Sequence, residues 1–152
     1  MKDIQIRNMK EKDIDEISEL ERLSFKTPWS RKSFEEELEN KVARYIVAEA
    51  EGKVIGYCGV WIIVDEGHIT NVAVHPDYRG QGIGKMLVEH LIALCKDEEV
   101  YKLTLEVNTN NTVAQGLYQS FGFESQGVRK GYYTDTNEDA MIMWYMEERE
   151  EE

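Results

Sequence analysis

The sequence predicts an α/β (α+β) domain in which helices flank a mixed central sheet. Its 152 residues contain no internal repeat or low-complexity linker and only two prolines, which indicates one continuous domain. Strand patterns and helix patterns alternate along the chain, as expected when helices cover the faces of a sheet. A chain of this size buries a core without disulfide or metal support. We therefore predict one domain over residues 1–147, followed by an acidic tail at residues 148–152.

Two helices are predicted in the first quarter of the chain, after a short strand at residues 4–7. Apolar residues at helical spacing between residues 9 and 23, among them Ile14 and Ile17, predict the first helix. Ser30 is a favourable N-cap, and it predicts that the second helix begins directly after it.

The rest of the chain alternates between strands and helices. Residues 44–50 and 54–63 predict a hairpin, because the glycine-containing turn EGK joins two apolar strand patterns. The elements that follow are a strand at residues 67–74, a helix that begins within a glycine-rich loop, a strand at 101–107, a short helix at about 111–120, and strands at 123–133 and 139–146.

The loop RGQGIGK, residues 79–85, places three glycines at alternate positions between an arginine and a lysine. A phosphate-binding loop of the nucleotide triphosphatases needs a different glycine spacing and a Ser or Thr after the lysine. The dinucleotide fingerprint G-x-G-x-x-G differs in spacing too. Ile83, Leu87 and Leu91 recur at helical spacing, so the loop leads into a helix whose first N–H groups could hold anionic oxygens. A tight turn without a ligand is the alternative.

Acidic residues outnumber basic residues by 30 to 18, which gives a net charge of −12. This charge disfavours nucleic acid and anionic membrane surfaces as partners, and it allows a cationic partner. The sequence shows neither an apolar run of membrane-spanning length nor an apolar leader at its start. We therefore expect a cytoplasmic protein, with no nucleic acid and no membrane among its partners.

Neither the cysteines nor the histidines predict a metal site. Cys58 lies in an apolar strand pattern and Cys95 near the end of a helix pattern, so both are expected to be reduced core residues. His68, His75 and His90 show no metal-ligand spacing and no recognisable Ser or Cys nucleophile. We therefore expect no metal and no covalent acyl-enzyme.

Several strings together resemble the GNAT superfamily of N-acetyltransferases. The loop RGQGIG, residues 79–84, matches the signature [Q/R]-x-x-G-x-[G/A], and LTLEVNTNNTVAQGLYQSFGF, residues 103–123, is similar to the corresponding segment of the family. FKTPWS at residues 25–30 and ITNVAVHPDYRGQGIGKML at residues 69–87 resemble the RimI-type ribosomal-protein-alanine N-acetyltransferases. The resemblance implies a GNAT fold and direct transfer, in a ternary complex, from acetyl-coenzyme A to the N-terminal alanine of a ribosomal protein.

The resemblance also implies which residues hold acetyl-coenzyme A. The backbone of Val72, Ala73 and Val74 would pair with the pantetheine arm. The pyrophosphate would rest on the loop residues Arg79, Gly80, Gln81, Gly82, Ile83, Gly84 and Lys85. Asn111 would contact the cofactor arm at the start of the following helix. Without the resemblance, the three strand residues predict only core packing, and Asn111 predicts a plain helix cap.

Two residues are candidates for proton transfer. Glu106 is a carboxylate in the strand pattern LTLEV, where alternation places it on the face opposite Leu105 and Val107. Tyr118 lies in the LY pair of the following helix. The resemblance makes Glu106 the general base for the amine and Tyr118 the acid that protonates the leaving thiolate. An exposed strand glutamate and a packing tyrosine are the alternatives.

The sequence says less about which amine accepts the acetyl group than about the donor. An α-amine has a reference pKa of about 8, against about 10.4 for lysine, so the neutral nucleophile is easier to obtain at a chain terminus. Family comparison places Trp29, Tyr132 and Tyr133 in the peptide groove, although tyrosine pairs are also common in strands. The N-terminus of a basic protein, such as a ribosomal one, is the expected substrate. The alternatives are a small amine (a polyamine or an aminoglycoside) and a non-catalytic acetyl-coenzyme A sensor.

Overall fold

The computed structural model describes residues 3–25 and 28–147, so the predicted acidic tail lies outside the described residues. The strands are β1 (Ile4–Asn8), β2 (Ala43–Ala50), β3 (Lys53–Ile63), β4 (Glu66–Val74), β5 (Lys102–Asn108), β6 (Glu124–Tyr133) and β7 (Glu138–Met146). The α-helices are α1 (Ile14–Ser24), α2 (Arg31–Glu39), α3 (Ile83–Asp97) and α4 (Thr112–Ser120), and short 3-10 turns lie at Glu11–Asp13 and Pro76–Tyr78.

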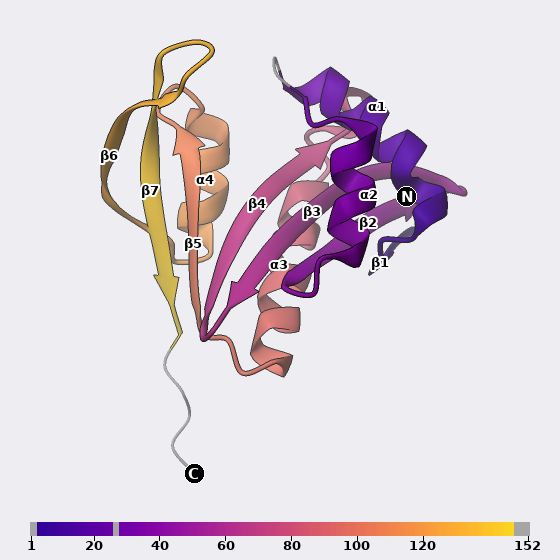
Figure 1. Ribbon diagram of the computed structural model, residues 1–152, viewed down its shortest axis with the longest axis horizontal. Coiled ribbons are helices and arrows are strands. Elements are labelled where there is room, and N and C mark those ends of the chain that lie inside the picture. Colours follow the sequence, from indigo (N-terminus) through magenta and orange to yellow (C-terminus); the bar gives the residue numbers. More distant parts are fainter. Residues whose placement is uncertain (1–2, 26–27, 148–152) are drawn as a thin grey trace.

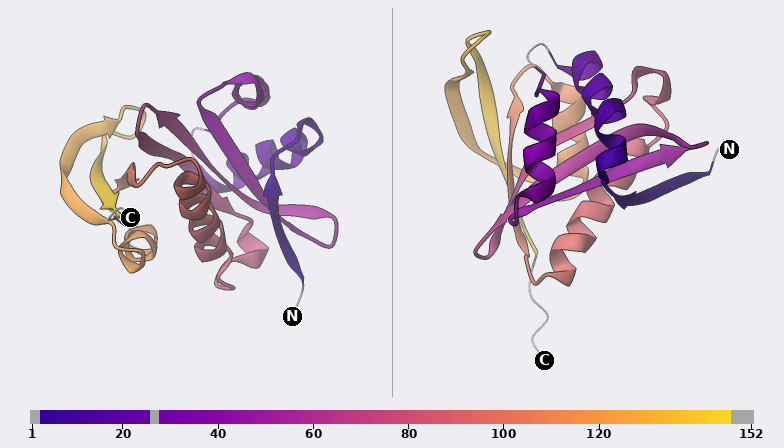
Figure 2. Two further views of the ribbon diagram at one scale, coloured as in Figure 1. Left: turned by 90° about the horizontal axis from the view of Figure 1, so that it is seen from below. Right: turned by 45° about the vertical axis from the view of Figure 1, so that its right-hand side comes forward.

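The strands form one sheet in the order β1-β2-β3-β4-β5-β7-β6. β4 and β5 run parallel, and the other neighbouring pairs are antiparallel. α1 and α2 lie on one face of the sheet, and α3 and α4 lie on the other (Figures 1 and 2). The predicted mixed sheet with flanking helices is therefore confirmed.

The first helix begins later than its apolar spacing predicts. Met9 is buried but precedes the helix, which begins at Ile14 after a 3-10 turn. The Asp13 carboxylate accepts a hydrogen bond from the backbone N–H of Lys10 at 2.8 Å and pairs with the Arg7 guanidinium at 2.8 Å. These bonds hold the chain in a turn, so the helical pattern extends further toward the N-terminus than the helix does.

Side-chain caps mark the start of two predicted helices. Ser30 Oγ accepts a hydrogen bond from the Ser33 N–H at 3.2 Å, and α2 begins at the next residue. Asn111 Oδ1 accepts one from the Ala114 N–H at 3.1 Å at the start of α4. The prediction for Ser30 is confirmed, and Asn111 serves as a helix cap whatever else it contacts.

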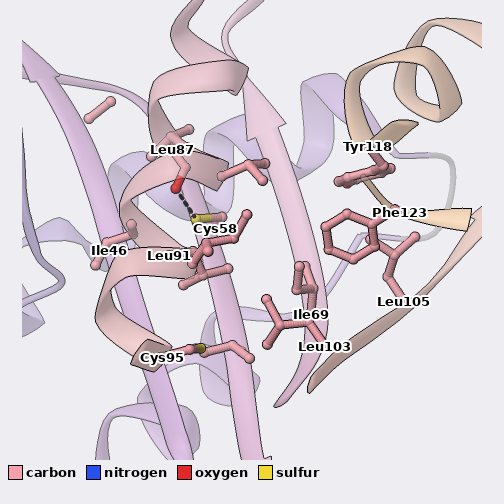
Figure 3. Packing of buried hydrophobic residues seen from close by; sticks show 14 of the residues in the cluster. Ile46, Cys58, Ile69, Leu87, Leu91, Cys95, Leu103, Leu105, Tyr118 and Phe123 are labelled. Atoms are coloured by element: carbon pink, nitrogen blue, oxygen red, sulfur yellow. Dashed lines mark hydrogen bonds between the residues drawn. The ribbon is translucent and has the colours of Figure 1, made fainter. Parts of the chain in front are cut away.

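Apolar side chains fill both faces of the sheet. On one face, Leu87 and Leu91 of α3 pack with Cys58 of β3, whose thiol lies 3.7 Å from the Leu87 carbonyl oxygen (Figure 3). Both cysteines are buried and free, as predicted. On the other face, the ring of Phe34 in α2 packs edge-on against Tyr57 of β3. These two layers fix the sheet between its helices.

The pairing between β4 and β5 is short, and it leaves the sheet open at one end. The ladder runs from Glu66 opposite Lys102 to His68 opposite Thr104, and it stops there. Beyond these residues the two strands diverge, as Figure 1 shows. The C-terminal half of β4 therefore has a backbone edge with no ladder partner on the β5 side.

A β-bulge in β4 redirects side chains beside this opening. The register against β3 shifts between Gly59 and Val60, which leaves Thr70 as the extra residue. Thr70 and Asn71 consequently both hydrogen-bond to tyrosines of the core under α1 and α2, although a regular strand would place them on opposite faces.

Candidate active site

A pocket of about 820 Å³ lies where β4 and β5 diverge. Its walls combine the α1–α2 loop, the two diverging strands, α4 and the β6–β7 turn. Predicted site residues line it from the α1–α2 loop, β4, β5, α4 with its N-cap, and the end of β6, namely Trp29, Val72, Glu106, Asn111, Tyr118, Tyr132 and Tyr133. The fold thus brings together both proton-transfer candidates and all three residues predicted for the peptide groove.

Glu106 faces this pocket from β5. Alternation along the strand buries Leu105 and Val107 in the core and leaves Glu106 on the opposite face, as predicted. Its Oε2 lies 2.6 Å from Nε2 of His68 on β4. The Glu106 side chain is 18% exposed and that of His68 33%, so the pair lies between the core and solvent.

His68 also lines the pocket, although the sequence predicts no role for it. Its partner is neither a metal nor a Ser or Cys nucleophile but a carboxylate on another strand. The hydrogen bond with Glu106 raises the pKa of His68, burial opposes the rise, and the carboxylate charge adds to it. The pair depends on the register of the two strands, in which His68 lies opposite Thr104, two residues before Glu106.

Tyr118 projects from α4 and is 7% exposed. Its ring packs against Phe123 with the centroids 5.7 Å apart, and Figure 3 shows the two side by side. Burial raises the pKa of the Tyr118 phenol, so the group keeps its proton. The hydroxyl has no hydrogen-bond partner within residues 3–25 and 28–147, and it is therefore available to a ligand.

Three aromatic side chains form the outer part of the pocket. The rings of Tyr132 and Tyr133 meet edge-on at 5.0 Å, at the end of β6. Burial, the neighbouring tyrosine and the carboxylates of Glu106 and Glu138 raise the pKa of Tyr133 to about 12. Trp29 lies on the α1–α2 loop with its ring 5.6 Å from Phe34. The rings of Tyr132 and Tyr133 therefore lie close enough to Glu106 for its charge to raise their pKa values.

The glycine-rich loop lies at the start of α3 and does not line this pocket. Gly80 and Gly82 adopt φ angles of 79° and 80°, and Gly82 is the N-cap of the helix. These left-handed angles are the physical reason for glycine at both positions. Arg79 Nε donates to the Val74 carbonyl at 3.1 Å, which ties the loop to the end of β4. Ile83 is buried and can offer only its backbone.

The strand residues predicted to hold the cofactor arm differ in exposure. Ala73 is buried in the core under α1 and α2, whereas Val72 lines the pocket. Gly84 in the first turn of α3 packs near Val74 and Leu117, so this part of the helix lies between β4 and α4. The start of α3 thus lies beside the C-terminal end of β4, the strand whose Val72 lines the pocket.

No group of three His, Cys, Asp or Glu side chains in the described part of the chain has the geometry of a metal site. Among the helices of that part, none is both long enough and apolar enough to cross a bilayer.

Diverging parallel strands, a pocket between them and a glycine-rich loop at a helix start together define the class of this protein. The chain belongs to the acetyltransferase (GNAT) family, whose model matches residues 14–123. It is thus an acyltransferase of the family that uses acetyl-coenzyme A, and the predicted family and fold are confirmed.

Individual relatives are similar over nearly the whole chain. A protein of Bacillus subtilis (strain 168) is 49% identical over 140 residues. Its name ascribes to it the activity of a ribosomal protein bS18-alanine N-acetyltransferase. That match covers 91% of this chain and 93% of the relative. The ribosomal protein bS18-alanine N-acetyltransferase of Escherichia coli (strain K12) is 36% identical over 142 residues, which cover 91% and 94% of the two chains.

Solved structures agree with these sequence relationships. The crystal structure of the ribosomal-protein-S18-alanine N-acetyltransferase from Escherichia coli matches with a TM-score of 0.90 at 32% identity, over 99% of this chain and 97% of that one. The PaiA N-acetyltransferase from Thermoplasma acidophilum, solved in complex with coenzyme A, matches with a TM-score of 0.81 at 21% identity, over 95% and 99%. The second match shows the shared fold.

Proposed function

We propose that this chain acetylates the N-terminal α-amine of a protein that begins with alanine, and that a basic ribosomal protein is its substrate. One observation carries the proposal: the Glu106 carboxylate, which is hydrogen-bonded to His68, and the Tyr118 phenol line the same pocket. The names of the Bacillus subtilis and Escherichia coli relatives support the choice of substrate.

The proposed binding site of the donor, acetyl-coenzyme A, extends from the start of α3 along β4 to the pocket. Its pyrophosphate would accept hydrogen bonds from the backbone N–H groups at the start of α3, where the helix dipole also favours negative charge. The pantetheine arm would pair with the edge of Val72–Val74, which has no strand neighbour on the β5 side in the described part of the chain. Asn111, at the start of α4, lines the pocket and would contact the arm there.

The amine must lose a proton before it can attack the thioester carbonyl. We assign this proton to the carboxylate of Glu106, which lies in the pocket and is hydrogen-bonded to His68 at 2.6 Å. His68 is the more exposed member of the pair, so it can pass the proton on to solvent.

Attack forms the C–N bond, and collapse of the tetrahedral intermediate breaks the C–S bond. The departing thiolate takes the proton of the Tyr118 hydroxyl. The burial that raises the pKa of Tyr118 keeps this proton in place until the thiolate develops. The second proton of the attacking nitrogen leaves toward Glu106, which releases it to solvent, and the Tyr118 phenolate regains a proton from solvent. The products are an acetylated terminus and free coenzyme A.

Release of coenzyme A from a panel of amines tests this proposal. The panel contains basic peptides that begin with alanine or methionine, the alanine peptide with an acetylated terminus, and spermidine. We expect the free alanine peptide to have the highest kcat/KM and the blocked peptide to be inert. Faster turnover of spermidine would replace the proposal with the small-amine alternative, and no turnover of any amine would favour a non-catalytic sensor.

A further inference from the structure

A buried carboxylate on α1 connects two walls of the pocket. Glu21 is 1% exposed and accepts hydrogen bonds from three other segments. The backbone N–H of Trp29 donates to its Oε2 at 2.7 Å, Asn71 Nδ2 donates to its Oε1 at 2.6 Å, and the Tyr57 hydroxyl also donates to Oε1. Nothing in the proposed proton transfers uses this carboxylate.

The chemistry of this cluster fixes the orientation of the Asn71 amide. A carboxylate can only accept, so the amide group that faces Glu21 must be the NH₂ end. Burial and the charge of Glu21 raise the pKa of Tyr57, which keeps its proton on the hydroxyl that donates to Glu21. Asn71 Nδ2 also donates to the Tyr57 oxygen at 3.1 Å. All these contacts place the NH₂ group toward the core.

The other end of the same amide is then directed away from the cluster. Asn71 lines the pocket, and its Oδ1 has no hydrogen-bond partner within the described ranges 3–25 and 28–147. The β-bulge at Thr70 produces this placement, since it turns Asn71 to the α1–α2 face immediately before Val72. A hydrogen-bond acceptor of fixed direction therefore lies beside the strand edge proposed to hold the thioester arm.

We propose that Asn71 Oδ1 accepts a hydrogen bond from the first peptide N–H of the substrate, and that Glu21 is the positioning residue that fixes this amide. The inference rests on the proposed function and names a contact of that site. In the proposed mechanism, the α-amine gives its proton to Glu106 on the opposite strand. The first peptide N–H belongs to the second residue of the substrate, one residue further along its chain. Asn71 and Trp29 belong to the wall that Glu21 organises, so this wall receives the peptide backbone.

The contact can be tested by replacing the first peptide bond of an alanine-first peptide with an ester, which removes that N–H and keeps all the side chains. For the wild-type enzyme, we expect the amide substrate to exceed the ester substrate about 5-fold in kcat/KM, the effect of one neutral hydrogen bond. For Asn71→Leu, which has a similar size and no acceptor, the two substrates should agree within about 2-fold. Because the ester also changes the basicity of the amine, the amide-to-ester ratio of each variant is divided by that of the wild-type enzyme, and this effect, which is common to both ratios, then cancels.

Glu21→Gln tests the positioning role separately. A glutamine at this site can pair with either end of the Asn71 amide, so the amide-to-ester ratio should fall toward that of Asn71→Leu while the KM for acetyl-coenzyme A stays constant. Glu16→Gln is the matched control on the same helix, because Glu16 accepts the Val54 N–H at 2.7 Å outside the pocket. It should keep the wild-type ratio.

The outcomes separate the two proposals. An unchanged 5-fold ratio in Asn71→Leu, or no discrimination by the wild-type enzyme, overturns the Asn71 contact and leaves the proposed function intact. An alanine-first peptide that is not acetylated at all overturns both. Asn71→Ala provides the same comparison if Asn71→Leu does not fold, and melting temperatures establish which variants are folded.

Discussion

At the residue scale, Glu106 takes the proton from the amine in the proposed mechanism. Glu106→Gln keeps the size of the side chain and removes the base, so we expect kcat to fall by about 10²-fold. The loss should shrink as pH rises, because an α-amine with a reference pKa of about 8 becomes neutral without help. Steady-state assays across pH measure both effects. Glu66→Gln, outside the pocket, is the control, and wild-type rates for Glu106→Gln would remove this residue from the mechanism.

The pair formed by His68 and Glu106 has a pH signature in stability. A histidine whose pKa is raised on folding stabilises the protein fully below its unfolded pKa of about 6.5, and this contribution disappears as pH rises through the folded pKa. His68→Gln should therefore lower the melting temperature most near pH 6 and progressively less toward pH 9. Thermal unfolding of both proteins over this range measures the difference. A difference that grows with pH would show that the pair is not ionic in the folded protein.

Residue types and alternation were enough to predict that Glu106 lies on the face of its strand opposite Leu105 and Val107, whereas its role as the base came from the family resemblance. Tyr118 and the aromatic groove residues came from the family resemblance. His68, Asn71 and Glu21 could not be predicted in the same way. Their importance depends on contacts between distant strands and helices, and on a bulge that changes which face Asn71 occupies.

At the element scale, the loop before α3 allows a matched pair of Gly→Ala substitutions. Gly82 has a φ of 80°, so Gly82→Ala should lower the free energy of unfolding by about 1–2 kcal/mol and weaken acetyl-coenzyme A binding about 10-fold. Gly84 is helical, and an added methyl group would meet its nearest neighbour, Leu117 Cδ2, at 3.5 Å, which is ordinary contact. The Gly84→Ala variant should therefore bind acetyl-coenzyme A as the wild-type protein does and be slightly more stable than the wild type.

Calorimetric titration with acetyl-coenzyme A and thermal unfolding measure both properties. Equal affinities for the two folded variants would mean that the loop does not hold the pyrophosphate. A stable Gly82→Ala protein would in turn contradict the structural reason given for glycine at that position.

The order and type of the elements were predicted from local patterns, and most of their ends agree within one or two residues. Helical spacing failed at Met9, because the contacts of Asp13 hold the chain in a turn and the helix begins only at Ile14. The divergence of β4 from β5 could not be predicted from periodicity, because both strands continue with regular patterns beyond the last paired residues. The pocket exists because of this divergence, so the family resemblance was needed to expect it.

At the scale of the whole molecule, the net charge of −12 makes attraction to a basic substrate depend on salt. Screening shortens the reach of surface charges to about 8 Å at physiological ionic strength. The kcat/KM of a basic alanine-first peptide should therefore fall as salt increases, while that of an uncharged peptide with the same first residues stays nearly constant. Equal salt dependence for the two peptides would exclude electrostatic attraction as a source of substrate preference.

Locating the acetyl group on a product shows directly whether this protein acetylates an α-amine at a chain terminus. The substrate is a basic peptide with a free N-terminal alanine and one internal lysine, incubated with the enzyme and acetyl-coenzyme A. Fragmentation mass spectrometry then distinguishes α-acetylated from ε-acetylated peptide. We predict that the acetyl group lies on the N-terminal alanine and that Glu106→Gln forms about 10²-fold less of this product. Acetyl groups found on the lysine, or found equally on both amines, would contradict the proposed acetylation of the chain terminus.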